Sequence, residues 1–478
     1  MRNPVLKWLV VIVLGSVVLS PTGRAQGALT RSELSWRLQA LERAWEVAKP
    51  GAREIALPQI EAAVQSFFRL DFVAAGEAMD GARAELNGGA PLGGVALRAE
   101  NRIAWAGLEG LEPESIPVVH VDWSGEAAED QRLELRWEAG EGGLEPIPVL
   151  GGTSASCVMP PDLVRDLEGT SCRVRAVLVG HAGGKVEERA LEFVWLGLPR
   201  SPLGGYRSQI ESGASGSEGF GPASALALVD LMDGLVTGDI PEVELPFAKW
   251  MVELERRANA LESGEPWMDS SQAGDHLIAF PGRRPAARAR LFVPSGLDPK
   301  RVVPLVIALH GAGGSEHMFF EAYGNGKLVE LARARGWIVV SPAHARLKRP
   351  RVAGVVEALA QVLPVDRSRV AVVGHSMGAL AGLGMVEREP ESVAALVAMG
   401  GGRAPRNAGE LAGLPVHVAV GEHDFGRGGG EVLHAALATS ERSAELELHV
   451  TQGSEHLMVV QDGLERAFAF LDRALAPE

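Results

Sequence analysis

The sequence predicts an α/β fold with a largely parallel sheet in residues 275–478, preceded by helices and by a small antiparallel β domain. From Asp275 onward, apolar runs of strand length alternate with segments of helical periodicity, as is typical of a sheet covered by helices on both faces. Apolar residues recur at helical spacing within residues 27–90. Within residues 91–200 the period shifts toward two. We therefore expect several structural units in one chain.

Length and charge narrow the class of protein. The chain has 478 residues, 46% of them apolar, which is enough for more than one packed core. The formal net charge is -15, and no basic stripe is present to neutralise phosphates, so nucleic acid is not expected as a partner.

The first 26 residues resemble a secretory signal. Positive charge at Arg2 and Lys7 precedes an apolar run from Trp8 to Leu19, and small residues follow near Ala25. The run is short for a spanning helix, so we expect cleavage and no stable membrane anchor afterwards. The predicted location is secreted or periplasmic.

Residues 27–90 predict a helical hairpin. Leu34, Leu38, Leu41 and Trp45 recur at helical spacing, and residues 58–86 continue in the same style.

Residues 91–200 predict a small β-sandwich-like domain that contains both cysteines, Cys157 and Cys172. In an oxidising compartment a bridge between them would add about 3 kcal/mol of stability. The alternative is two buried free thiols. The sequence assigns the domain no function beyond spacing or packing, with binding of a polymer or partner left open.

Two connecting segments follow the β domain. Residues 201–222 are rich in Gly and Ser and predict a linker. Residues 223–274 predict a helical connector that docks against the next domain, with a cover over the mouth of that domain's site as the alternative.

A strand pattern at residues 370–373 stops at Gly374-His375-Ser376-Met377-Gly378, and a helical pattern begins at once. A sharp turn of this kind projects a serine hydroxyl into a cleft, and glycines allow the close approach that the turn needs. The pattern resembles the nucleophile elbow of the α/β-hydrolase superfamily. The eight strand candidates of residues 275–478 match that superfamily's sheet in number and order, so the resemblance covers less than half of the chain.

The resemblance implies a catalytic triad of Ser376, Asp424 and His456, because the acid and the base of this fold follow later strands in that order. His456 would accept the serine proton, and Asp424 would orient the imidazole.

Other residues near these positions are interpreted as an alternative acid or as structural residues. Glu422 is an alternative acid to Asp424, since either carboxylate can orient a histidine. We expect structural roles for His375 and His423. His344 is read as an ordinary loop histidine, with a place in the pocket wall as the alternative.

The run His310-Gly311-Ala312-Gly313-Gly314-Ser315 resembles the family's HGxGG oxyanion loop. The resemblance implies backbone N–H donors at Ala312 and Met377, and Gly311 and Gly313 would let the backbone approach the substrate.

Motifs for other chemistry are absent from the sequence. It has no P-loop, no H-E-x-x-H, no CxxC and no dinucleotide fingerprint with its acidic partner. We therefore predict no metal and no cofactor.

The predicted function is a serine hydrolase that cleaves carboxylic esters through an acyl-enzyme intermediate. HGAGGS with GHSMGA is similar to the carboxylesterase and polyhydroxyalkanoate-depolymerase-like branch. Residues 403–414 form a short connection where lipases often insert a lid, which predicts an open, modest pocket for a small ester or the ester-bearing end of a polymer.

Two other functions remain open. One is a serine peptidase of the prolyl-oligopeptidase kind, although the β region is too short for a propeller. The other is a secreted binding protein with an inactive hydrolase domain, whose signature would be a missing triad residue.

Overall fold

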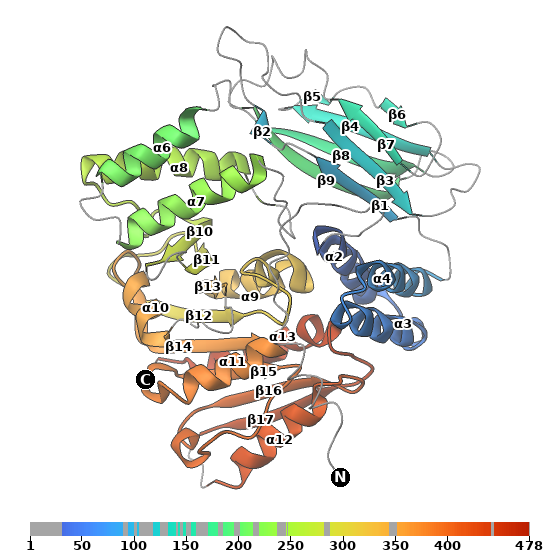
Figure 1. Cartoon of the computed structure of the whole chain (residues 1–478). Helices are drawn as coiled ribbons and strands as arrows, with labels where there is room; N and C mark the ends of the chain where they lie inside the picture. The colour runs from blue at the N-terminus through green and yellow to red at the C-terminus, as the bar shows by residue number, and fades with distance from the viewer. Residues whose placement is uncertain are drawn as a thin grey trace.

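The computed structural model describes residues 31–88, 201–213, 219–236, 245, 247–281, 287–343, 351–440 and 444–477, together with the backbone of strands β1 to β9 between residues 94 and 195 (Figure 1). The predicted signal segment and His344 lie outside these residues. Within them, no helix combines the length and the apolar character that crossing a membrane requires.

The C-terminal region contains the predicted mostly parallel sheet of eight strands. Their order is β10-β11-β13-β12-β14-β15-β16-β17. β11 runs antiparallel to both of its neighbours, and the remaining pairs are parallel. The bounds are Gly274–Phe280, Ala287–Val293, Val303–Leu309, Ile338–Pro342, Val365–His375, Ala395–Met399, Val416–Gly421 and Leu446–Thr451 for β10 to β17. The fold class predicted for this region is confirmed.

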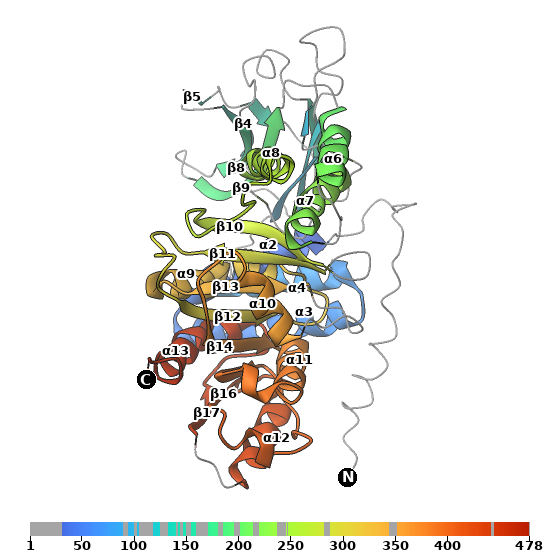
Figure 2. The ribbon, with the colours of Figure 1, turned by 90° about the vertical axis from the view of Figure 1, so that its left-hand side faces the viewer.

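Helices cover both faces of this sheet because its strands are apolar on both sides. In β12, Val306 and Ala308 face one core, whereas Leu305 and Ile307 face the other. α9 (Lys327–Arg335) and α13 (Met458–Ala474) pack on the first face. α10 (Val352–Leu359), α11 (Met377–Val386) and α12 (Arg427–Ala438) pack on the second, as Figure 2 shows.

The N-terminal part is helical as predicted, but it has three helices rather than a hairpin. These are α2 (Arg31–Val47), α3 (Pro50–Phe68) and α4 (Phe72–Leu86). The extra break follows Leu70, whose φ is 63°, and Asp71 then caps α4 by accepting a hydrogen bond from the Ala74 N–H. We call α2, α3 and α4 the N-terminal roof, because they lie against the α9 and α13 face and share its core (Figure 1).

The strands between residues 94 and 195 form two sheets, mostly antiparallel. One has the order β1-β3-β7, and the other has the order β2-β9-β8-β4-β5 with β6 paired to β4. The bounds are Gly94–Ala99, Ile103–Ala104, Val118–Ser124, Arg132–Ala139, Gly142–Gly143, Ile147–Val149, Ser154–Val158, Ser171–Val179 and Lys185–Trp195 for β1 to β9. Cys157 belongs to β7 and Cys172 to β8, in different sheets. Their side chains are outside the described part, so the disulfide stays a prediction.

Helix α6 (Ser201–Gly213) occupies most of the segment predicted as a linker, so that prediction is wrong. Ile210 is fully buried and Tyr206 packs against the same cluster as α7 (Phe220–Val236) and α8 (Phe247–Ser263). This spacing of four residues places both side chains on one helix face, and their burial outweighs the low helix propensity of the local Gly and Ser residues.

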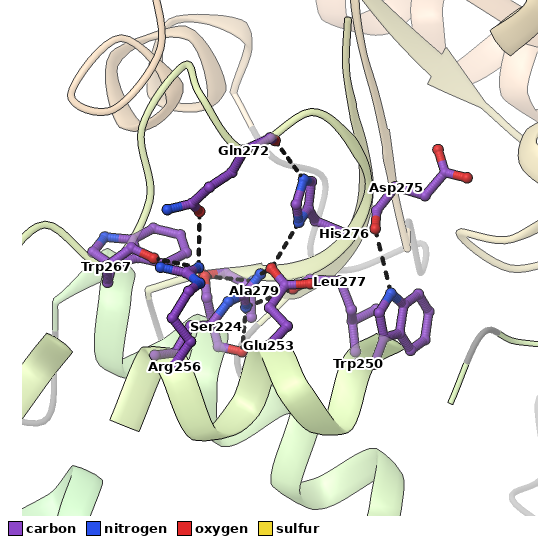
Figure 3. Close-up of polar contacts among 11 residues, drawn as sticks. Ser224, Trp250, Glu253, Arg256, Trp267, Gln272, Asp275, His276, Leu277 and Ala279 are labelled. Atoms are coloured by element: carbon purple, nitrogen blue, oxygen red, sulfur yellow. Dashed lines mark hydrogen bonds and ion pairs between the residues drawn. The ribbon is translucent and has the colours of Figure 1, made fainter. Parts of the chain in front are cut away.

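Helices α7 and α8 dock on β10 through buried polar groups (Figure 3). Glu253 accepts hydrogen bonds from Arg257 and from His276 Nδ1, the latter at 2.7 Å. Burial raises the pKa of Glu253, but these two partners outweigh it and lower the pKa to about 2. Next to these three side chains, Arg256 donates to the Trp267 carbonyl at 2.9 Å. The connector therefore packs on the sheet edge.

Candidate active site

Ser376 occupies the turn between β14 and α11 in a conformation that is rare for its residue type. Its φ is 55° and its ψ is -115°. Such strain persists only where the surroundings fix it. Here the Ser376 N–H donates to the Met399 carbonyl at 2.8 Å, and the Ser376 carbonyl accepts from the Ala379 N–H at 3.0 Å.

The two elbow glycines are required by space. A Cβ at Gly374 would lie 2.3 Å from the Gly378 oxygen, and a Cβ at Gly378 would lie 1.9 Å from the Leu309 oxygen. Neither contact is sterically allowed, because both partners are backbone atoms that cannot rotate away. The turn therefore accepts no other residue at these positions without moving the serine.

The structure brings the three predicted triad side chains together at the carboxyl ends of the parallel strands. Ser376 Oγ–H donates to His456 Nε2 at 2.9 Å, and His456 Nδ1–H donates to Asp424 Oδ1 at 2.7 Å. Asp424 and His456 are only 5% and 2% exposed. Burial raises the pKa of Asp424, but the His456 hydrogen bond and the Gly426 N–H outweigh it, so the net direction is downward and the carboxylate is charged.

Glu422, the alternative acid, has other partners than His456. Glu422 accepts the Gly453 N–H at 2.9 Å, and its side chain is 40% exposed. His423 is also exposed, with its Nε2 3.9 Å from the Glu422 carboxylate. The hydrogen bond of His456 therefore goes to Asp424, and neither neighbour takes part in it.

His375 connects the elbow to the two neighbouring loops. Its Nε2–H donates to the His456 carbonyl at 2.9 Å, so its Nδ1 accepts from the Tyr323 hydroxyl at 3.1 Å. The same hydroxyl accepts the Gly311 N–H at 3.2 Å. Burial, followed by the nearby His456, lowers the pKa of His375 to about 3, so the ring is neutral. Tyr323 was missed in the sequence, where it stands in a Gly-rich stretch without a motif.

The predicted oxyanion loop follows β12 and lies in the same pocket wall as Ser376. Gly313 has a φ of 79°, which favours glycine, and the Gly314 N–H donates to the Gly311 carbonyl at 3.3 Å. Ala312 lies between them, and Met377 is the first residue of α11. The donor role of their N–H groups stays a prediction.

The pocket above Ser376 has a volume of about 90 Å³. Residues of the catalytic region form its floor, among them Gly311, Ala312, Gly313, Gly314, Tyr323, Ser376 and His456. Residues of the N-terminal roof form the opposite wall, among them Leu34, Leu38, Ala63, Val64, Phe67 and Phe68. The modest size expected from the short 403–414 connection agrees with this volume, whereas the contribution of the N-terminal roof to the pocket wall was not predicted from the sequence.

The described side chains contain no group of three or more His, Cys, Asp or Glu residues arranged to hold a metal ion.

Comparison with known proteins agrees with the fold of the C-terminal region. Residues 304–474 match the family described as the α/β hydrolase fold. The C-terminal region therefore has the α/β-hydrolase fold, and the match covers less than half of the chain. No curated protein matches the sequence.

Solved structures resemble the fold at low identity. A thermostable esterase is 13% identical, with a TM-score of 0.38 over 78% of this chain and 98% of its own. A ferulic acid esterase is 14% identical, with a TM-score of 0.36 over 43% of this chain and 100% of its own. An S-formylglutathione hydrolase from Agrobacterium tumefaciens is 16% identical, with a TM-score of 0.34 over 43% and 97%. These similarities concern the fold alone.

Proposed function

We propose that the protein is a serine hydrolase that cleaves carboxylic esters through an acyl-enzyme intermediate. The observation that carries the proposal is the continuous hydrogen-bonded line from Asp424 through His456 to the strained Ser376. A serine is a weak nucleophile until a base can take its proton, and this arrangement supplies that base with a fixed tautomer.

The reaction follows from the positions of these groups. Ser376 Oγ attacks the ester carbonyl carbon while His456 Nε2 takes the hydroxyl proton, and the N–H groups of Ala312 and Met377 stabilise the oxyanion. The imidazolium then protonates the departing alcohol. In the second half, His456 takes a proton from water while the water oxygen attacks the acyl carbon. The imidazolium then returns this proton to Ser376 Oγ, which leaves as the free hydroxyl and releases the acid.

The pocket favours an ester over a peptide. Its wall from the N-terminal roof is apolar apart from Arg31 and Ser35, and no Asp or Glu lines it among the described residues. A binding site for a free peptide N-terminus would need such a carboxylate. A volume of about 90 Å³ suits a short acyl group, because drug-sized pockets have roughly 300–1,000 Å³.

The test compares ester with amide substrates and uses Ser376→Ala as the control. We expect the wild type to hydrolyse p-nitrophenyl acetate and butyrate, to leave aminoacyl p-nitroanilides intact, and to be labelled by a fluorophosphonate probe. Ser376→Ala should lose both turnover and labelling, by about 10⁶-fold in kcat. Anilide cleavage without ester cleavage would instead support a peptidase, and a folded, unlabelled wild type would support an inactive binding protein.

Export remains part of the proposal and rests on the first 26 residues alone.

A further inference from the structure

The N-terminal roof touches the predicted oxyanion loop directly. Arg31 Nη1 donates to the Gly313 carbonyl at 3.2 Å. A Cβ built on Gly313 would lie 2.5 Å from Cζ of Phe67. The Phe67 ring therefore lies against the backbone of Gly313, with no room for a side chain between them.

Neighbouring aromatic rings hold Phe67 in this position. Phe72 stacks on it with ring centroids 5.8 Å apart and an interplanar angle of 24°, and Phe68 meets it edge to face at 5.8 Å. Phe68 in turn meets Phe425, whose ring lies 3.8 Å from that of His456. The ring of Phe67 is thus braced on two sides.

Contacts between α2 and α13 fix the roof over the pocket. Trp45 Nε1 donates to both oxygens of the Asp462 carboxylate, at 3.2 and 3.1 Å. The Gln461 side chain donates to the Glu42 carbonyl at 3.1 Å. Trp45 is 1% exposed, so α2 is held by buried contacts, and the wall that carries Phe67 is part of the domain's core.

We propose that Phe67 limits the length of the acyl group that the enzyme accepts. This inference rests on the ester hydrolysis proposed above. The carbonyl oxygen of a bound ester must point to the donors of the oxyanion loop, so the acyl chain runs along that loop and meets the ring above Gly313. The alcohol leaves on the side of His456, which protonates it. Phe67 consequently closes the acyl side of a small cavity.

The experiment measures kcat/KM for p-nitrophenyl acetate, butyrate, hexanoate and octanoate with the wild type, Phe67→Leu and Phe67→Ala. The leaving group is constant, so only the acyl chain varies. We expect the wild type to prefer acetate and butyrate, and Phe67→Ala to raise the octanoate-to-acetate ratio by about tenfold or more. Phe67→Leu should give a ratio between those of the wild type and Phe67→Ala, since leucine retains more side-chain volume than alanine.

The matched control is Ile60→Ala, which removes a buried side chain from the same helix, α3, at a position that does not line the pocket. Its chain-length profile should stay that of the wild type. An equal shift in Ile60→Ala would show that loosening of the roof, and not the volume of Phe67, sets the limit, and would overturn the inference.

A second substrate series separates the acyl side from the alcohol side. Methyl, butyl and octyl acetates vary the alcohol only, and Phe67→Ala should leave their ratios unchanged. A shift confined to this series would overturn the inference while leaving ester hydrolysis intact. Absence of turnover on every ester, with no fluorophosphonate labelling of the wild type, would instead refute the proposed function itself.

Discussion

At the scale of single residues, the site depends on buried groups beside the triad. Glu455 precedes His456, is 3% exposed, and accepts the N–H groups of Leu457 and Met458 at the start of α13. Burial raises the pKa of Glu455 from its ordinary 4.5 to about 7, although the adjacent His456 opposes the change. A carboxyl group that becomes charged near neutral pH therefore lies next to the predicted base.

This shift predicts a pH-dependent difference in stability between the wild type and Glu455→Gln. Between about pH 4.5 and 7 the folded state binds more protons than the unfolded state, so the contribution of Glu455 to stability falls as pH rises through this window. The Gln oxygen still accepts both N–H groups and does not titrate. Urea unfolding at several pH values should show that the free energy of unfolding of Glu455→Gln rises relative to that of the wild type from pH 4.5 to 7. A constant difference would contradict the raised pKa of Glu455.

The two hydrogen bonds of the Tyr323 hydroxyl predict that its removal lowers both stability and kcat. Tyr323→Phe leaves the Gly311 N–H and His375 Nδ1 without this partner in a buried site. We expect a loss of about 1–3 kcal/mol in the free energy of unfolding, with a lower kcat because the oxyanion loop and the elbow lose their shared contact.

The chain offers a matched control, since it has two tyrosines. Tyr206→Phe on α6 lies outside the pocket lining and should leave kcat unchanged. Equal kcat values for both variants would argue against a positioning role for Tyr323.

At the scale of elements, α2 is held by its face toward α13. Trp45→Ala should lower the free energy of unfolding by about 3–5 kcal/mol, because it removes a buried ring and the donor to Asp462. Val47→Ala on the same helix is the control. Val47 is 81% exposed, so its change should stay within about 0.5 kcal/mol in the same denaturant titration.

The sequence predicted the type of most elements but not their partners. The eight strands were predictable because their apolar runs are bounded by turn residues and each meets a neighbour of the same kind. The apolar stripe of Leu34, Leu38, Leu41 and Trp45 was visible too. Periodicity shows which face of a helix is apolar, yet it does not show what covers that face, and here α13 lies more than 400 residues away in sequence.

The candidate site, too, was predictable from the sequence only in part. Ser376, Asp424 and His456 were predictable in position because Ser376 directly follows a strand and the other two lie in the loops just after later strands. The structure brings them within hydrogen-bonding distance. Tyr323 and Phe67 were not predictable as parts of the site. They reach it only through a turn with positive φ angles at Gly324 and Asn325 and through the packing of a distant helix.

At the scale of the whole molecule, one core joins the two ends of the described chain. In the sequence, β1 to β9 and α6 to α8 separate the N-terminal roof from the eight-stranded sheet. In space they lie beyond the β10 edge of that sheet, at the top of Figure 1. The roof therefore belongs to the catalytic region in space although it is remote from it in sequence.

The contact between Trp45 and Asp462 spans 417 positions. The residues of the N-terminal roof that close the pocket leave the ribosome long before α13, the helix on which the roof rests. At roughly 5–20 residues per second, the early helices wait for roughly 20 to 80 s before their apolar face is covered. A nascent chain therefore has no finished pocket until α13 has emerged, and the acyl selectivity proposed for Phe67 begins only then.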